Sequence, residues 1–209
     1  SGGPDSMLTA YLIYGRFIRQ GYDTGNLFFL HCNHKVRPGN TEDEQFIRSH
    51  FEGTQLIVCT RTGKGKTSEE ELRKWRYLEF NKRTATYGID RLTFGHNLTD
   101  RIETTFLNLL RGAKLNGFIA IQQEGNHHLL PGVKVIRPIL EMTKAEVMHI
   151  CKEHKIPYRK DPTNTEATTS MRNKLRNKVL PPLYKLSHKQ TATTNTFIES
   201  MKHIYRQID

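Results

Sequence analysis

The apolar positions of this chain fall into two kinds of run: some recur at helical spacing, and others are short and continuous. Runs with apolar residues three and four positions apart predict helices. The expected helices cover residues 6–20, 42–51, 68–87, 98–110 and 143–154. Short apolar runs predict strands that are buried on both faces. The expected strands cover residues 26–32, 55–60, 91–95 and 129–136, the last interrupted at Pro131-Gly132. This alternation predicts an α/β fold, in which a mainly parallel sheet carries helices on both faces.

A glycine-rich stretch, Ser1-Gly2-Gly3-Pro4-Asp5-Ser6, leads into the first expected helix. Adjacent glycines let the backbone approach a ligand closely. A helix N-terminus offers free N–H groups and a positive dipole end, which together bind anions such as phosphate. A carboxylate is out of place beside phosphate unless a cation lies between them, so Asp5 indicates Mg²⁺. The alternative is a simple turn in which Asp5 or Ser6 caps the helix.

His31, Asn33 and Arg37 form a polar cluster at the end of the first expected strand. The Asn33 amide has the geometry to make two hydrogen bonds to an adenine edge. A lone histidine after a strand is usually a structural residue, and that alternative stays open for His31. The other polar residues within the same seven positions favour a ligand site.

His96, Asp100 and Glu103 follow the third expected strand at i, i+4 and i+7 spacing, which places them on one helical face. With Asp5, Asp100 is suited to hold Mg²⁺, which takes a few carboxylates together with phosphate oxygens. The alternative is that the acidic side chains only complement the helix dipole. Because the carboxyl ends of parallel strands meet at one sheet edge, all these segments are expected to share one site.

The formal charge is +11, from 32 Lys and Arg against 21 Asp and Glu among 209 residues. An excess of this size favours a polyanionic partner such as nucleic acid, although a merely basic protein is the alternative. No apolar run reaches the roughly 18 residues that a membrane-spanning helix needs. The three cysteines are scattered without a C-x-x-C pair, which argues against a disulfide framework, a zinc site or an iron–sulfur cluster and favours a reducing compartment.

A basic segment over residues 171–181 alternates arginine and lysine with asparagine and ends at a proline. This composition favours contacts with an RNA backbone over a solvated basic face. Arg111 closes the helix expected over 98–110, where it either neutralises the dipole or binds phosphate. The tail from residue 188 to 209 is expected to form one amphipathic helix.

The first six residues match S-G-G-x-D-S, the phosphate loop of the N-type ATP pyrophosphatases, or PP-loop family. Further motifs resemble, in order, those of the tRNA(Ile)-lysidine synthetases within that family, from residue 1 to about 186. The matching segments are 1–6, 31–37, 71–77, 95–103, 111–117, 137–138, 161–164 and 172–181. In one departure, Thr99 stands where the family usually has the first of two adjacent aspartates. In another, these 209 residues do not extend into the long carboxy-terminal tRNA-binding domains of many members. Family members carry an apolar strand before the loop, so we expect one upstream of Ser1. The alternative is a sheet without its central strand.

The resemblance implies a Rossmann-like fold of the adenine nucleotide alpha hydrolase type and an ATP-dependent ligase reaction. ATP adenylates the wobble cytidine of a tRNA for isoleucine, and free lysine then displaces AMP to form lysidine, with ATP converted to AMP and pyrophosphate. The implied cofactors are ATP and Mg²⁺, and the implied partners are tRNA and free L-lysine. The implied location is the cytoplasm or the plastid stroma, without a membrane, and oligomeric state is not predicted.

The resemblance and the residue types together assign roles to individual positions. The catalytic residues are predicted to be Asp5, His96, Asp100 and Glu103, with the metal on Asp5 and Asp100. His96, expected to have a pKa near neutral pH, or solvent is expected to take the proton that lysine must lose. ATP is predicted to contact Ser1, Gly2, Gly3, Pro4, Asp5, Ser6, His31, Asn33, Gly95, His96 and Arg111. The tRNA is predicted to contact Arg37, Arg73, Arg76, Arg111, Arg172, Asn173, Arg176 and Lys178.

Two domains are expected, a PP-loop ATP pyrophosphatase domain over residues 1–160 and a helical tRNA-contacting segment and tail over 161–209. Two other functions stay open. A tRNA thiolase of the same family would use paired cysteines, which the sequence spacing does not offer. A non-catalytic nucleotide-binding module would not need the carboxylates Asp5 and Asp100.

Overall fold

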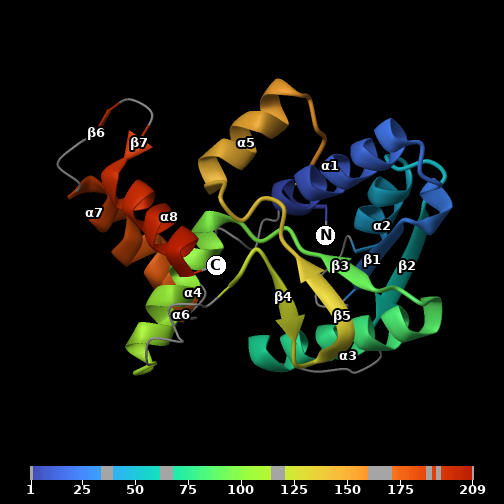
Figure 1. Ribbon diagram of the computed structural model, residues 1–209, viewed down its shortest axis with the longest axis horizontal. Helices are drawn as coiled ribbons and strands as arrows, with labels where there is room; N and C mark the ends of the chain where they lie inside the picture. Colours follow the sequence, from blue (N-terminus) through green and yellow to red (C-terminus); the bar gives the residue numbers. More distant parts are fainter. Residues whose placement is uncertain are drawn as a thin grey trace.

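The computed structural model describes residues 2–33, 40–61, 68–113, 121–159, 171–186, 190–191 and 194–208. The helices are α1 (Pro4–Gln20), α2 (Asn40–Arg48), α3 (Glu69–Tyr87), α4 (Leu98–Leu110), α5 (Lys144–Glu153), α6 (Met171–Lys174), α7 (Leu180–Lys185) and α8 (Thr196–Ile208), with a 3-10 turn η1 (Thr24–Asn26) and a π-helical turn η4 (Leu175–Val179). The strands are β1 (Phe28–Asn33), β2 (Gln55–Thr60), β3 (Arg91–Thr93), β4 (Glu124–His127), β5 (Leu130–Ile136), β6 (Gln190–Thr191) and β7 (Thr194–Asn195). Figure 1 shows their arrangement.

The predicted α/β fold with helices on both faces is confirmed. β1 and β2 pair in parallel, as do β3 and β5, while β4 adds an antiparallel edge to β5. In Figure 1, α1 and α5 lie on one side of these strands and α3 lies on the other. The described strands form a two-stranded sheet of β1 and β2, a three-stranded sheet in the order β3-β5-β4, and a small hairpin of β6 and β7.

Several element boundaries differ from the prediction, among them α2 at residues 40–48 rather than 42–51 and β1 at 28–33 rather than 26–32. Three further differences concern α1, β5 and the tail. α1 begins at Pro4 with Gly3 as its N-cap, rather than at residue 6, because proline is favoured in the first helical turn. β5 continues through Pro131-Gly132, where Gly132 takes a φ of 75°. The tail is helical only over α8, because the β6–β7 hairpin precedes it.

β4 is an element that the pattern of apolar residues did not predict. Its sequence, Glu124-Gly-Asn-His127, contains no aliphatic side chain, so no alternation marks it as a strand. It forms because its backbone pairs with β5 across a tight turn. The turn places His127 and His128 at the tip of this hairpin.

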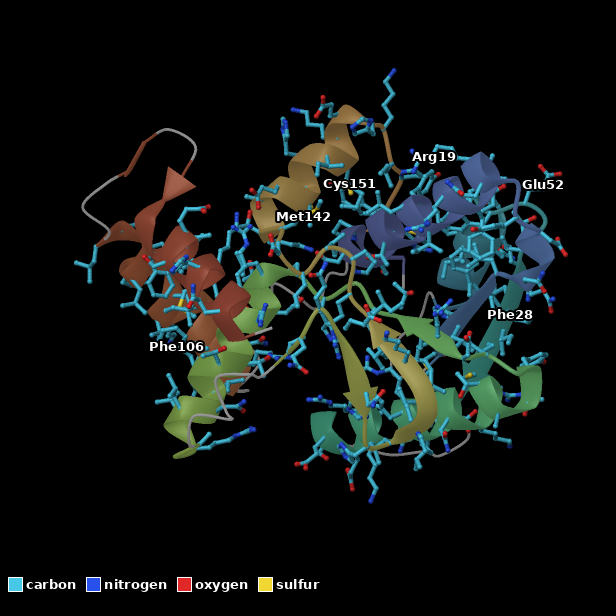
Figure 2. All side chains as sticks on the ribbon, in the orientation of Figure 1. Arg19, Phe28, Glu52, Phe106, Met142 and Cys151 are labelled. Carbon is cyan, nitrogen blue, oxygen red and sulfur yellow. The ribbon has the colours of Figure 1, made fainter. Side chains whose placement is uncertain are left out.

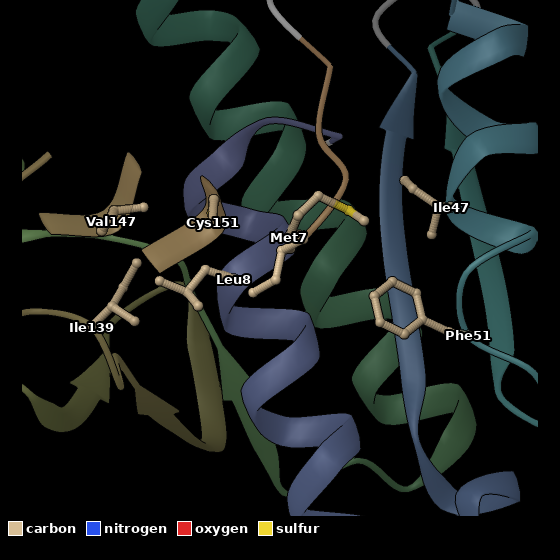
Figure 3. Packing of buried hydrophobic residues seen from close by; sticks show 8 residues of the cluster. Met7, Leu8, Ile47, Phe51, Ile139, Val147 and Cys151 are labelled. Atoms are coloured by element: carbon tan, nitrogen blue, oxygen red, sulfur yellow. The ribbon is translucent and has the colours of Figure 1, made fainter. Parts of the chain in front are cut away.

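The core lies in two layers around the strands, and a third cluster joins the helices that follow. Met7, Leu8, Ile47, Phe51 and Val147 pack together on the side of α1, α2 and α5, as Figure 3 shows. On the opposite side, side chains of α3 pack against β3 and β5. The third cluster joins α4 to η4, α7 and α8, so part of the helical segment predicted over 161–209 packs directly on α4. Among the described residues, every helix is too short or too polar to span a bilayer.

Candidate active site

The glycine-rich loop forms the N-terminus of α1, as the sequence predicts. Gly3 is extended and caps the helix, and Ser6 Oγ donates a hydrogen bond of 3.1 Å to its carbonyl oxygen. The Gly2 carbonyl oxygen accepts a hydrogen bond of 2.8 Å from the backbone nitrogen of Arg159. The first turn of α1 is therefore held in place, with the positive end of the helix dipole at the loop.

Gly95 brings the end of β3 against this first turn. A Cβ atom at Gly95 would lie 2.8 Å from the Asp5 carbonyl oxygen and 3.1 Å from the Ser6 nitrogen. Both neighbours belong to the backbone of α1, so no side-chain rotation relieves the contact. Glycine is thus required for the two segments to meet at this distance.

Gly95→Ala is expected to lower the free energy of unfolding by about 1–3 kcal/mol, because the methyl group forces the helix backbone to shift. Gly15→Ala is the matched control, since no atom lies within 4 Å of a Cβ at that helical position. Alanine there is expected to stabilise the helix by about 0.5–1 kcal/mol. Urea unfolding measures both, and equal effects of the two substitutions would contradict the close contact.

Asp5 lies on the first turn of α1, and both of its carboxylate oxygens have partners. Oδ1 accepts a hydrogen bond of 2.8 Å from Asn97 Nδ2, and Oδ2 accepts one of 2.5 Å from Lys144 Nζ. The backbone nitrogen of Lys144 donates in turn to Thr99 Oγ1 at 3.3 Å. The Asp5 carboxylate is therefore the point at which α1, α4 and α5 meet.

Lys144 is not among the site residues that the sequence predicts, although a signal for it was present. It directly follows Thr143, whose capping box with Glu146 marks the start of α5. A lysine in the first turn of a helix is unfavourable beside the positive end of the dipole. A nearby anion compensates for this placement, and in the structure that anion is Asp5.

Asn97 links Asp5 to Asp100 through the N-cap of α4. Its Oδ1 accepts a hydrogen bond from the Asp100 backbone nitrogen, and its own backbone nitrogen donates to Asp100 Oδ2, both at 3.1 Å. Burial raises the pKa of Asp100 above its ordinary value, and the negative charge of Asp5 adds to this. The two carboxylates predicted to hold a metal therefore share one neighbour and influence each other electrostatically.

Glu103, predicted as catalytic, is 0% exposed and is held by arginine side chains. Arg176 donates from Nε to Oε1 at 2.5 Å and from Nη2 to Oε2 at 2.8 Å, while Arg172 Nε lies 3.5 Å from Oε2. Arg172 also donates to Thr104 Oγ1 at 2.7 Å. Burial raises the pKa of Glu103, and the hydrogen bond from Arg176 opposes that rise. This geometry gives Glu103 a positioning role, because it anchors α6 and η4 on α4.

His96 follows β3 and is hydrogen bonded to Arg137 from the end of β5. Arg137 Nε donates to His96 Nδ1 at 3.3 Å, and Arg137 Nη1 donates to the Gln122 carbonyl oxygen at 2.6 Å. The pKa of His96 is lowered to about 3, mainly by burial and to a smaller extent by the positive charge of Arg137 and other arginines. The expectation that the pKa of His96 lies near neutral pH is therefore wrong. The imidazole is neutral at pH 7 and is a weak base.

The protein is expected to become less stable in acid, because His96 takes up a proton in the unfolded chain but not in the folded protein. An unfolded histidine titrates near pH 6.5, whereas His96 in the folded protein stays neutral down to about pH 3. Stability that is present above pH 6.5 is therefore lost as the pH falls, by about 1.4 kcal/mol per pH unit at most. Urea unfolding at pH 7 and pH 5 measures the loss. His96→Gln should show a smaller loss, and an identical loss would contradict the assignment.

The remaining predicted site residues lie at different distances from this centre. His31 and Asn33 share one face of β1, which ends at the sheet edge with Asn33. Arg73 and Arg76 lie in the first half of α3, and their charges act on His96. Arg111 follows the C-terminal end of α4, about 20 Å along a helix of 13 residues from the N-cap, so the structure does not bring it to the site. Two predicted residues lie outside the described part of the chain, Ser1 and Arg37.

Comparison with protein families and curated proteins identifies relatives of this chain. A family model described as "PP-loop domain" matches residues 1–183. The tRNA(Ile)-lysidine synthase of Prochlorococcus marinus is 33% identical over 218 residues, which cover 99% of this chain and 62% of that protein. The enzyme of the same name from Synechococcus sp. is 31% identical over 188 residues, covering 90% and 56%. The chain spans about half the length of the curated relatives that it matches.

Among solved structures, the U34-tRNA thiolase NcsA from Methanococcus maripaludis with its iron–sulfur cluster is similar in fold. The TM-score is 0.73 at 18% identity, and the match covers 100% of this chain and 69% of that one. At this identity the likeness shows the fold alone. The family model covers most of the chain, including the loop at the start of α1, Asp5 and the α4 carboxylates. The chain therefore belongs to the PP-loop domain family.

Proposed function

We propose that this chain is the catalytic part of a tRNA(Ile)-lysidine synthetase. It would use ATP to adenylate the wobble cytidine of a tRNA, after which free lysine attacks and displaces AMP, leaving pyrophosphate and AMP as the other products. One observation carries the proposal: Asp5, in the first turn of α1, is joined through Asn97 to Asp100. The curated relatives of that name support the choice of substrate.

The residues present fit a Mg²⁺ ion that accompanies ATP. Such an ion is usually held by one or two carboxylates together with substrate phosphates, and Asp5 and Asp100 provide two carboxylates that act on each other. When bound, Mg²⁺ would neutralise charge on the departing pyrophosphate. The Lys144 ammonium, already 2.5 Å from Asp5, adds a positive charge from the protein at the same place.

The N-terminus of α1 would bind phosphate through its free N–H groups, and Asn33 at the end of β1 would pair with the adenine edge. His96 is neutral and accepts a hydrogen bond from Arg137, so its role is to orient that arginine rather than to remove a proton. Glu103 is occupied by Arg176. Arg176 Nη2 also lies 3.5 Å from Asp100 Oδ1, and Asp100 is proposed to hold the metal, so solvent is left to accept the proton that the attacking lysine loses.

Arg73, Arg76 and Lys178 would contact the RNA backbone, because Arg73 and Lys178 are exposed cations and Arg76 is half-buried one turn after Arg73 on α3. Arg172 and Arg176 belong to a different group, since both bind side chains of α4. Their proposed contribution to tRNA binding is therefore indirect: they position the segment that carries Asn173 and Lys178.

Nucleotide analysis of the reaction tests the first half of the proposal. Incubation with ATP, Mg²⁺ and total tRNA should release pyrophosphate, and adding free L-lysine should release AMP in an equal amount, with both products dependent on the tRNA. Formation of ADP instead, or AMP release that is the same without tRNA, would contradict the proposed adenylation. A module that only binds nucleotide would release neither product.

A tRNA thiolase is the rival within the family, and the structure bears on it through the cysteines. Cys32 and Cys59, distant in sequence, are register partners on β1 and β2. Cys59 is 0% exposed, and Cys32 packs against the core cluster formed by α3, β3 and β5. Cys151 lies elsewhere, with its Sγ 3.8 Å from the Pro4 carbonyl oxygen. Within the described part of the chain, no group of three or more histidine, cysteine or acidic residues is placed to hold a metal ion. The structure thus places side by side two cysteines that are far apart in sequence, and nucleoside analysis of the reacted tRNA distinguishes lysine from sulfur as the incoming group.

A further inference from the structure

A series of contacting rings, tilted toward one another at its inner end and stacked at its outer end, leads from the candidate active site to the surface. His96 contacts Phe94, with ring centroids 5.5 Å apart, and Phe94 contacts Tyr77 at 5.8 Å. Tyr77 stacks on His127 at 4.1 Å with an interplanar angle of 10°. His127 stacks on His128 at 4.6 Å and 21°. The series therefore begins at a residue beside the reaction site and ends at an exposed imidazole.

The tip of the β4–β5 hairpin holds the outer rings of this series in place. His127 is the last residue of β4, and His128 lies in the turn. The Leu129 backbone nitrogen donates a hydrogen bond of 3.2 Å to His127 Nδ1, which fixes the plane of the ring. Tyr77, only 4% exposed, is the buried support beneath it. His128 is therefore supported by the ordered rings of His127 and Tyr77. Figure 1 shows the tip of the β4–β5 hairpin beside α3.

The charges around the stack are positive. The Arg73 guanidinium lies 5.7 Å from the centroid of the Tyr77 ring. Burial, His128 and the nearby arginines lower the pKa of His127 to about 4, so this imidazole is neutral at pH 7. A neutral ring flanked by arginines suits an unpaired nucleobase, whose flat face stacks while the cations meet its phosphates.

We propose that His128, supported by His127 and Tyr77, is a stacking surface for an unpaired base of the RNA substrate. The proposal rests on the proposed function in one respect only, that the substrate is RNA. It adds a contact that neither the glycine-rich loop nor the basic segment provides. The exposed face of His128 continues an existing parallel stack, so a base placed there requires no rearrangement of the hairpin.

Direct binding to a hairpin RNA that carries a fluorescent purine analogue in its loop tests the stacking surface. His128→Ala should weaken binding roughly 10-fold, the contribution of about one stacked base, and should reduce quenching of the analogue. His128→Phe keeps a flat ring without charge or hydrogen bonds and should restore both. His149→Ala, an exposed histidine on α5 with a side chain 77% exposed, is the matched control and should bind like the wild type.

Three outcomes would overturn the proposal. Binding by His128→Ala equal to the wild type would exclude the contact. Weak binding by both His128→Ala and His128→Phe, with an unchanged melting temperature, would assign His128 a charge or hydrogen-bond role. A lowered melting temperature in His128→Ala with unchanged RNA affinity would make the stack a support for the hairpin.

The same experiment separates this proposal from the proposed function. If the wild type forms AMP with tRNA but His128→Ala binds RNA normally, the stacking surface fails and the enzyme assignment stands. If RNA binding depends on His128 while no AMP forms with tRNA, the surface stands and the reaction assignment fails.

Discussion

Arg176→Ala is expected to lower the free energy of unfolding by about 3–5 kcal/mol. The guanidinium makes two hydrogen bonds to Glu103, at 2.5 and 2.8 Å, and Glu103 is 0% exposed. Although the Arg176 side chain is 41% exposed, Glu103 is buried, so removing Arg176 leaves that carboxylate with only Arg172, 3.5 Å away, which costs more than the pair contributes. Urea unfolding at pH 7 measures the change.

The loss of stability in Arg176→Ala should depend on the Glu103 carboxylate and on pH. Lys178→Ala changes an exposed cation of the same turn and should alter stability by less than about 0.5 kcal/mol. Adding Glu103→Gln to Arg176→Ala should recover part of the loss, because no unpaired carboxylate then remains. The loss in Arg176→Ala alone should also shrink in acid, where the Glu103 carboxyl takes up a proton. Equal destabilisation by Lys178→Ala and Arg176→Ala would show that the Glu103 pair does not anchor this segment.

Asp5→Asn is expected to reduce tRNA-dependent AMP formation by at least about 100-fold while the fold is retained. Asparagine has nearly the shape of aspartate and keeps an oxygen for Asn97 or Lys144, but it lacks the charge that a metal ion requires. The assay is AMP release at saturating ATP, Mg²⁺, L-lysine and tRNA. The melting temperature of the variant, compared with the wild type, reports on the fold.

Asp23→Asn is the matched control for Asp5→Asn. Asp23 is an exposed aspartate that caps the turn η1 through its side chain, so its substitution tests the same chemical change outside the site. Its AMP formation should equal that of the wild type. If Asp5→Asn retains wild-type turnover, the carboxylate takes no part in metal or phosphate binding.

Much of the fold could be predicted from local pattern. β2 and α4 begin and end where the apolar runs do, and capping boxes mark the starts of α3 and α5 through Ser68 and Thr143. These elements have signals within a few residues of each other. β4 has none, since its pairing partner in β5 decides its conformation. Nothing in a polar tetrapeptide specifies that partnership.

The site was predictable only as far as its motifs are contiguous. The loop at Asp5 and the segment at Gly95 lie against each other in the structure, as strand order predicts. The partners of the charged groups were not. Lys144 and Arg176 reach the site from 139 and 73 residues away, and no local spacing reveals such contacts. The low pKa of His96 likewise depends on burial and on arginines from distant segments.

Mass analysis of tRNA nucleosides after reaction with isotope-labelled lysine tests the central claim most directly. The complete reaction contains the protein, ATP, Mg²⁺, labelled L-lysine and a tRNA for isoleucine with a wobble cytidine. The account predicts a cytidine derivative that carries the label, formed only when both ATP and lysine are present. Modification that proceeds equally without lysine, or a nucleoside that has gained sulfur, would contradict it.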